Sequence, residues 1–187
     1  FLYVTNSITN DVGYIDLTTR LPLTYIPVGN KPWGAALTSD GKILVVSNRD
    51  DNTVSLINTS TNTVINTIHV GTSPWGLTLN PAGTKAYINN RGSGDVSVID
   101  IFKQQVIKTI KVGETPRFST ITADGTLLFI SNTDGNSVSV INTGSDEVIK
   151  TIDIGRKPSA IYASAVKNEV YGAADTTIKT INSDDLS

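Results

Sequence analysis

The chain has 187 residues, no cysteine and a formal net charge of -2 at pH 7. Without cysteine it can form no disulfide, no thiolate metal site and no cysteine nucleophile. The near-neutral charge excludes a global attraction to nucleic acid or to an anionic membrane surface. No run of the sequence approaches the roughly 18 apolar residues that span a bilayer, so we expect no membrane span.

Short β-strands are predicted along the whole chain. The first strong signal is an apolar run over 2–5, and a complete unit then follows from Trp33 to Ser73. Within this unit β-branched residues dominate, and Ser, Asp, Asn and Gly occupy the intervening turns. The predicted strands of the unit are 34–38, 43–46, 53–57 and 63–70. No window has a 3.6-residue apolar period, so we predict no helix of note.

The unit recurs every 42 residues. Three kinds of marker keep this spacing: a proline, a glycine that ends a Val-Gly or Ile-Gly pair, and an asparagine that closes an apolar run. They are Pro32, Pro74, Pro116 and Pro158; Gly29, Gly71, Gly113 and Gly155; and Asn6, Asn48, Asn90 and Asn132. The chain is therefore a repeat protein. Its approximate repeats are 1–31, 32–73, 74–115, 116–157 and 158–187, in a single domain.

A four-stranded antiparallel sheet with two apolar faces needs neighbouring sheets to cover both of them. Radial stacking of such sheets does this and leaves only short edges, so the pattern predicts an all-β propeller. The first strand of each unit is expected at the crowded axis, because the residues Gly34-Ala35-Ala36 are small and the next unit also has a glycine, Gly76, in the place of Gly34. The polar, alternating fourth strand is expected at the outer edge.

Tyr3-Val4-Thr5-Asn6 resembles the signature of the YVTN β-propeller repeat family. Variants recur at 45–48, 87–90 and 129–132, and Val28-Gly29, Ser39-Asp40-Gly41-Lys42 and Thr67 to Gly71 also resemble the family pattern. The resemblance covers the whole chain. It implies a bacterial or archaeal protein that is secreted, periplasmic or on the cell surface, often with a binding or surface-layer role. Some relatives bind single-stranded DNA or accompany redox modules.

The last repeat departs from the pattern, because Lys167 stands where Gly41 stands and Ala174 replaces the asparagine. It is either a closing blade or a copy that has drifted. The chain holds about four and a half repeats, whereas the resemblance implies a family whose members commonly have about seven blades. We therefore expect part of a larger propeller or assembly, with a compact ring of four or five blades as the alternative.

One face of the propeller is predicted to carry a Trp/Arg rim around the channel mouth. The connection from each fourth strand to the next first strand, and that from each second to third strand, emerge on the same face. The candidate ligand-binding residues of this rim are Trp33, Trp75, Arg117, Arg49, Arg91 and Arg156. Repeats two and three carry Trp-Gly where the fourth carries Arg117-Phe118, and such variation in a constant frame is how repeat proteins form binding surfaces.

Structural explanations stand beside this one. The tryptophans after proline can instead plug the axis or pack on a neighbouring blade. The arginines alternate with aspartates, so the rim can be a solvated mixed-charge surface rather than an anion site; these aspartates are Asp50, Asp51, Asp95 and Asp134. The recurrent asparagines are expected to cap the second strands by side-chain-to-backbone hydrogen bonds.

Catalytic constellations are not evident. His69 is the only histidine, and Pro27, Lys111 and Asp153 replace it in other repeats. With no cysteine, this argues against a zinc site, a Ser-His-Asp triad or haem ligation. Asp40 and Asp124 recur in turns, which favours turn formation over acid–base work. Asp50-Asp51-Asn52, Asp134-Gly135-Asn136 and Asp184-Asp185 only partly resemble calcium loops, so we predict no catalytic residue, no metal and no cofactor.

Three functions remain open. The favoured one is a non-enzymatic extracytoplasmic module for binding, adhesion or assembly, whose partner is a protein, a surface polymer or another copy of the chain. The second is single-stranded nucleic-acid binding by stacking on the tryptophans with arginine support, although the acidic balance opposes it. The third is a redox or lactone-hydrolysing propeller enzyme or subunit.

Overall fold

A computed structural model describes residues 1–164, 169–174 and 177–182. Lys167 and the Asp184-Asp185 pair lie outside these residues. The described chain forms 18 strands in five antiparallel sheets, each built from strands that are consecutive in sequence. This confirms the prediction of an all-β propeller, and each sheet is called a blade below. Among the described residues no helix has the length and apolarity needed to cross a membrane.

The blades follow chain order. The first contains β1 (Leu2–Asn6), β2 (Asp11–Asp16) and β3 (Leu21–Pro27). The second contains β4 (Pro32–Leu37), β5 (Ile43–Asn48), β6 (Thr53–Asn58) and β7 (Thr63–His69). The third contains β8 (Pro74–Leu79), β9 (Lys85–Asn90), β10 (Asp95–Asp100) and β11 (Gln105–Lys111). The fourth contains β12 (Pro116–Ile121), β13 (Leu127–Asn132), β14 (Ser137–Asn142) and β15 (Glu147–Asp153). The fifth contains β16 (Pro158–Ala163), β17 (Glu169–Ala174) and β18 (Thr177–Asn182).

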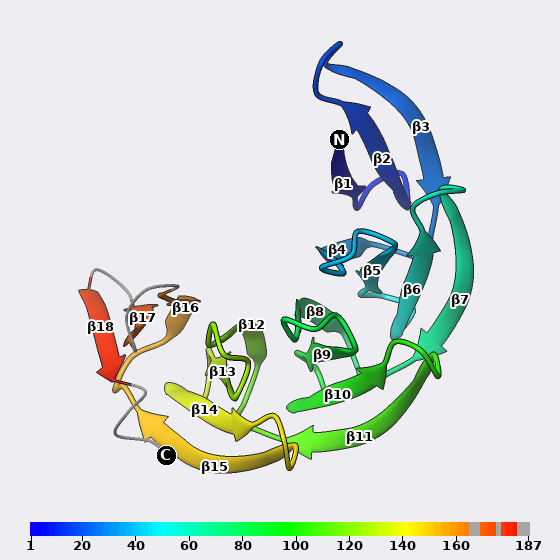
Figure 1. Cartoon of the computed structure of the whole chain (residues 1–187). Coiled ribbons are helices and arrows are strands. Elements are labelled where there is room, and N and C mark those ends of the chain that lie inside the picture. The colour runs from blue at the N-terminus through cyan, green and yellow to red at the C-terminus, as the bar shows by residue number, and fades with distance from the viewer. Residues whose placement is uncertain (165–168, 175–176, 183–187) are drawn as a thin grey trace.

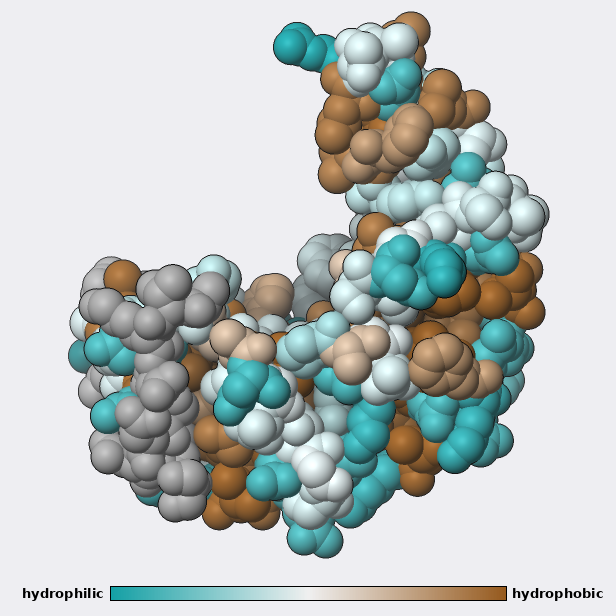
Figure 2. All heavy atoms as spheres, viewed as in Figure 1, coloured by the Kyte–Doolittle hydropathy of each residue, from teal (hydrophilic) through white to brown (hydrophobic). Residues whose placement is uncertain are grey.

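The blades stand side by side around an arc (Figure 1), with β4, β8, β12 and β16 on its inner side and β3, β7, β11 and β15 on its outer side. The space-filling view shows a wide opening on the concave side of the arc, beside the first blade (Figure 2). Apolar colour is visible over this blade, where Leu2, Leu21, Leu23 and Tyr25 are exposed.

The core lies between the blades. Strands β5 and β9 are buried on both faces, as their continuous apolar runs predict. For example, Val45 and Leu56 of the second blade pack in one cluster with Ala86 and Ile88 of the third. His69 ends β7 on the exposed side of that strand. Because neighbouring blades cover these apolar faces, a single repeat on its own would expose them to solvent.

The inner strands approach one another closely. A Cβ atom on Gly34 would lie 2.5 Å from the carbonyl oxygen of Trp75, and one on Gly76 would lie 2.3 Å from that of Arg117. Real Cβ atoms essentially never come within 3.0 Å of such an atom. Glycine is therefore required by the neighbouring backbone at these two positions, in β4 and β8.

The recurrent asparagines do not cap strands in the predicted way. Asn48 Nδ2 donates to the hydroxyls of Thr53 and Ser55, at 3.0 and 2.9 Å, rather than to a backbone carbonyl. Asn90 and Asn132 make equivalent side-chain bonds. The reason is the register: Asn48 pairs with Thr53 across the sheet, so its amide shares a face with residues 53 and 55. The asparagines link strands instead of ending them.

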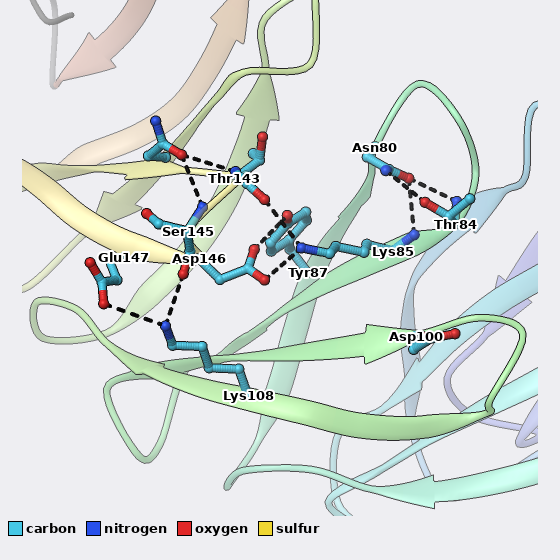
Figure 3. Close-up of polar contacts among 12 residues, drawn as sticks. Asn80, Thr84, Lys85, Tyr87, Asp100, Lys108, Thr143, Ser145, Asp146 and Glu147 are labelled. Atoms are coloured by element: carbon cyan, nitrogen blue, oxygen red, sulfur yellow. Dashed lines mark hydrogen bonds and ion pairs between the residues drawn. The ribbon is translucent and has the colours of Figure 1, made fainter.

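A buried polar cluster ties the third blade to the fourth (Figure 3). Asp146, in the turn before β15, accepts hydrogen bonds from Lys85 Nζ at 2.6 Å and from the Tyr87 hydroxyl at 2.9 Å. Burial, and then the Asp146 carboxylate, raise the pKa of Tyr87 well above its usual range. The first two blades repeat the contact, because Tyr3 donates to Asn62 at 3.0 Å. This recurrence indicates a structural contact between blades.

Candidate functional site

The two kinds of connection predicted to share a face do lie together. Arg49 N donates to Lys31 O at 3.1 Å, and Arg91 N donates to Ser73 O at 3.0 Å. Each bond joins the loop after the second strand of a blade to the connection that enters the same blade. The tryptophans at the start of β4 and β8 therefore lie near the arginines that follow β5 and β9.

Trp33 and Trp75 are in contact. Their ring centroids are 4.2 Å apart, and the ring planes meet at 40°. Trp33 is 43% exposed, whereas Trp75 is half-buried. Trp75 thus packs against the neighbouring blade, as one of the two interpretations predicted. Trp33, in contrast, keeps much of its surface open to solvent.

Three guanidinium groups lie over the Trp75 ring. The Cζ atoms of Arg49, Arg91 and Arg117 are 5.7, 5.3 and 5.7 Å from its centroid, within the range of cation–π attraction. These arginines come from the second, third and fourth blades in turn. Together with the two tryptophans they form what we call the Trp75 cluster: Trp33, Trp75, Arg49, Arg91 and Arg117.

The backbone beneath the cluster is held by the preceding blade. Thr5 Oγ1 donates to the carbonyl of Trp33 at 3.0 Å, and Ser47 Oγ donates to that of Trp75 at 2.6 Å. Asn89 Nδ2 donates to that of Arg117 at 3.1 Å. Sequence reasoning missed these three positioning residues. The sequence does contain a signal for them, since each of the three comes directly before one of the recurrent asparagines.

The aspartates of this face neutralise the cluster only in part. Arg49 Nε donates to Asp50 at 2.8 Å, and Lys31 also pairs with Asp50 at 2.9 Å. These two bonds, the Arg49 bond first, hold the pKa of Asp50 below its usual range.

The other aspartates have different partners. Asp51 binds the amides of Asn30, and Asp95 pairs with Lys111 at 2.9 Å. Asp134 bonds to Thr115 and Lys157; these bonds, and more weakly the charge of Arg117, lower its pKa. Across the described part of the chain, no carboxylate lies within ion-pair distance of Arg91 or Arg117.

Three buried donors of the cluster have no partner among the described residues. They are Nε1 of Trp75, Nε of Arg91 and Nε of Arg117. Buried polar groups in folded proteins are nearly always hydrogen-bonded, because an unpaired one is costly. The cluster therefore offers positive charge and unsatisfied donors in one place.

Arg156 does not join the cluster. It is exposed in the connection between β15 and β16, and it is not among the guanidinium groups over the Trp75 ring. The structure thus brings together five of the six predicted rim residues. Phe118, in the place of Gly34 and Gly76, is 38% exposed.

A cavity of about 580 Å³ opens on the opposite face, between the second and third blades. Its lining includes Thr38, Asp40, Ser60 and the exposed Phe102. Asp40 accepts hydrogen bonds from Thr38 Oγ1 and from Lys42 N, so its carboxylate shapes the turn, as the sequence indicates. The Thr38 bond, and then the Lys42 bond, lower the pKa of Asp40. The cavity has no comparable convergence of charged groups.

Comparison with known proteins supports the fold. No protein-family profile and no curated protein matches the chain by sequence. Among solved structures, hydrazine synthase of Kuenenia stuttgartiensis is similar with a TM-score of 0.80 and 23% identity, over 94% of this chain and 53% of that one. A functionally unknown protein from Desulfotomaculum acetoxidans DSM 771 is similar with a TM-score of 0.85 and 19% identity, over 96% of this chain and 61% of that one.

The chain spans between about half and two thirds of the length of these two structures. At such low identity, the likeness shows a shared fold and not a shared activity. Fold and comparison together define the class of the protein as a β-propeller.

Proposed function

We propose that this chain is a non-enzymatic binding module of a YVTN-type propeller that acts outside the cytoplasm. Its ligand is a protein or a surface polymer, and the Trp75 cluster is its contact site. The observation that carries the proposal is a half-exposed Trp33 packed on Trp75 beneath three arginines. Tryptophan and arginine are among the residue types enriched at the positions that dominate binding energy in protein interfaces.

The chemistry of the cluster favours binding over catalysis. An arginine stays protonated at any physiological pH, and an indole N–H only donates hydrogen bonds. Neither is suited to give up and recover a proton in a catalytic cycle. The backbone of the cluster is also held in place, because Ser47 and Asn89 donate hydrogen bonds to the carbonyls of Trp75 and Arg117. A rigid site loses little conformational entropy when a ligand binds.

Single-stranded nucleic acid is a weaker candidate ligand. That function needs several aromatic faces on which successive bases can stack. In the cluster, Trp75 is already covered by Trp33 and by guanidinium groups, which leaves Trp33 as the main open platform. The net charge of -2 also provides no general attraction for a polyanion.

The test compares the wild type with Trp33→Ala and with the double variant Trp33→Ala/Trp75→Ala. Phe102→Ala is the matched control, because it removes an 81% exposed aromatic side chain from the opposite face. Circular dichroism and thermal melting confirm folding. Each protein is applied to arrayed bacterial surface polysaccharides, to an immobilised copy of itself and to a single-stranded oligonucleotide.

The proposal expects binding to a polysaccharide or to the second copy that is lost in both tryptophan variants and retained in Phe102→Ala. Unchanged binding by folded tryptophan variants would place the contact site elsewhere. Binding to the oligonucleotide alone would favour the nucleic-acid function.

A further inference from the structure

The Trp75 cluster has the features of a receptor for one oxyanionic group. We propose that Arg49, Arg91 and Arg117 bind a carboxylate or phosphate of the ligand beside Trp75, and that Trp33 packs on a flat apolar part of the same ligand. This inference rests on the proposed function for the location of the ligand, and it adds the chemical class that the site selects.

The cluster concentrates positive charge. Three guanidinium groups gather within 5.7 Å of one ring centroid, and Asp50 pairs with only one of them. The attraction between a cation and an aromatic ring offsets part of their mutual repulsion, but it leaves their charge in place. An anion bound among them would remove that repulsion. The half-buried setting strengthens the attraction relative to bulk water.

The cluster also has unused hydrogen-bond donors. The unpaired buried atoms at the cluster are all donors: Nε of Arg91, Nε of Arg117 and Nε1 of Trp75. None of them can accept a hydrogen bond, so they cannot satisfy one another. A carboxylate or phosphate has several acceptor oxygens, and its geometry matches the planar fork of a guanidinium group. The missing partner of these donors is therefore an acceptor, and the positive charge of the guanidinium groups favours an anionic one. The other unpaired buried atoms among the described residues are asparagine Oδ1 acceptors, which lie outside the five residues of the cluster.

The apolar part of the proposed ligand is inferred from the exposure of Trp33. Its ring is 43% exposed and lies 4.2 Å from the ring of Trp75. A ligand whose anionic group meets the arginines would therefore place its next atoms near an open indole surface. Aromatic rings gain from offset or tilted packing on such a surface. The site should prefer an anion attached to a flat apolar body over the bare anion.

The repeats confine this site to one place in the arc. Arg49 and Arg91 occupy the same repeat position, where the first and fourth repeats have Ser7 and Thr133. Trp33 and Trp75 are likewise equivalent, and Arg117 is their counterpart in the fourth repeat. The full set of groups therefore meets only around the first strand of the third blade.

Intrinsic fluorescence provides a direct test, because both tryptophans of the chain belong to the cluster. The chain is titrated with phenyl phosphate and with benzoate, which distinguish phosphate from carboxylate. Benzyl alcohol is the neutral probe of similar shape, and inorganic phosphate is the bare anion. The proposal predicts a saturable signal change with at least one aromatic anion, weakened by added salt. It predicts no comparable change with benzyl alcohol.

Variants identify the groups responsible. Arg91→Gln and Arg117→Gln, made separately and checked by thermal melting, should each weaken binding of the anion about tenfold, as expected for loss of a charge-assisted hydrogen bond. Arg20→Gln is the matched control. It removes one positive charge from an exposed turn, at a position where the third repeat already has Gln104 with a similar positive φ.

Several results would overturn the inference: no saturable response to either aromatic anion, an equal response to benzyl alcohol, or undiminished affinity in both arginine variants. Failure here is distinct from failure of the proposed function. If Trp33→Ala abolishes polysaccharide or self-binding while the anions produce no response, the binding module stands without an anion site. If the anions bind while no arrayed partner does, the anion site stands and the module does not.

Discussion

Replacing Gly76 by alanine tests how the inner strands build the site. The new Cβ would lie 2.3 Å from the carbonyl oxygen of Arg117, whereas ordinary contacts begin at 3.4 Å. Strand β12 would therefore have to retreat from β8 by about 1 Å. Overpacking of this kind costs about 1–3 kcal/mol. For a chain of this size, that loss lowers the Tm by roughly 2–12 °C.

A fall in Tm for Gly76→Ala would be informative, because a glycine-to-alanine change in a strand is otherwise stabilising by about 0.5–1 kcal/mol. Gly13→Ala is the control, since its Cβ would meet only ordinary contacts at 3.5 Å and beyond. We expect Gly13→Ala to melt at or slightly above the wild-type temperature and Gly76→Ala to melt below it. Because Trp75 and Arg117 would move apart, Gly76→Ala should also bind phenyl phosphate more weakly. A Gly76→Ala variant as stable as the wild type would refute the close approach of the inner strands.

Two further predictions concern contacts within and between blades. Tyr87→Phe keeps the aromatic ring but loses the hydrogen bond to Asp146, and the fourth repeat already has a phenylalanine, Phe129, at the equivalent position. The change should lower the free energy of unfolding, measured by urea titration, by about 1–2 kcal/mol. Because burial raises the pKa of folded Tyr87, its stabilising contribution is complete below the ordinary tyrosine pKa of about 10 and declines at higher pH. The wild type should thus lose stability more steeply than Tyr87→Phe above that pH, and parallel profiles would contradict this. Asn48→Ala removes two buried hydrogen bonds and should cost about 2–3 kcal/mol, whereas a loss below about 0.5 kcal/mol would show that the asparagine links contribute little.

The fold could be predicted from the sequence because its periodicity is visible at several levels. The spacing of Pro32, Pro74 and Pro116 identifies the repeat, and the continuous apolar run of β5 shows that both of its faces are covered. The shared face of the connections follows from strand order alone. The small inner strand was also predictable, since Gly34 and Gly76 occupy the same place in successive repeats.

The contacts of the site could not be predicted to the same depth. A repeat places Trp33 and Trp75 on one face, but the distance between them depends on how closely neighbouring blades approach. That approach depends on backbone contacts at Gly34 and on hydrogen bonds such as that from Ser47 to Trp75. Sequence reasoning also placed Arg156 with the others, although the arc leaves it outside the Trp75 cluster.

The Lys85 pair was missed for a related reason. Its partner, Asp146, is 61 residues away and belongs to the next blade. The equivalent turn positions hold Asn62 and Gln104, so no carboxylate recurs there to reveal the pairing. The asparagine bonds were assigned to the wrong acceptors because cross-strand register, rather than local turn geometry, determines which groups Asn48 faces.

The most direct measurement of the central claim is an NMR correlation spectrum of the arginine Nε–H groups during titration with phenyl phosphate. The chain has five arginines, and only three of them lie over the Trp75 ring. We expect the signals of Arg91 and Arg117 to move and saturate together, while that of Arg20 stays in place. Signals that move equally for all arginines, or do not move at all, would contradict the assignment of this cluster as the binding site.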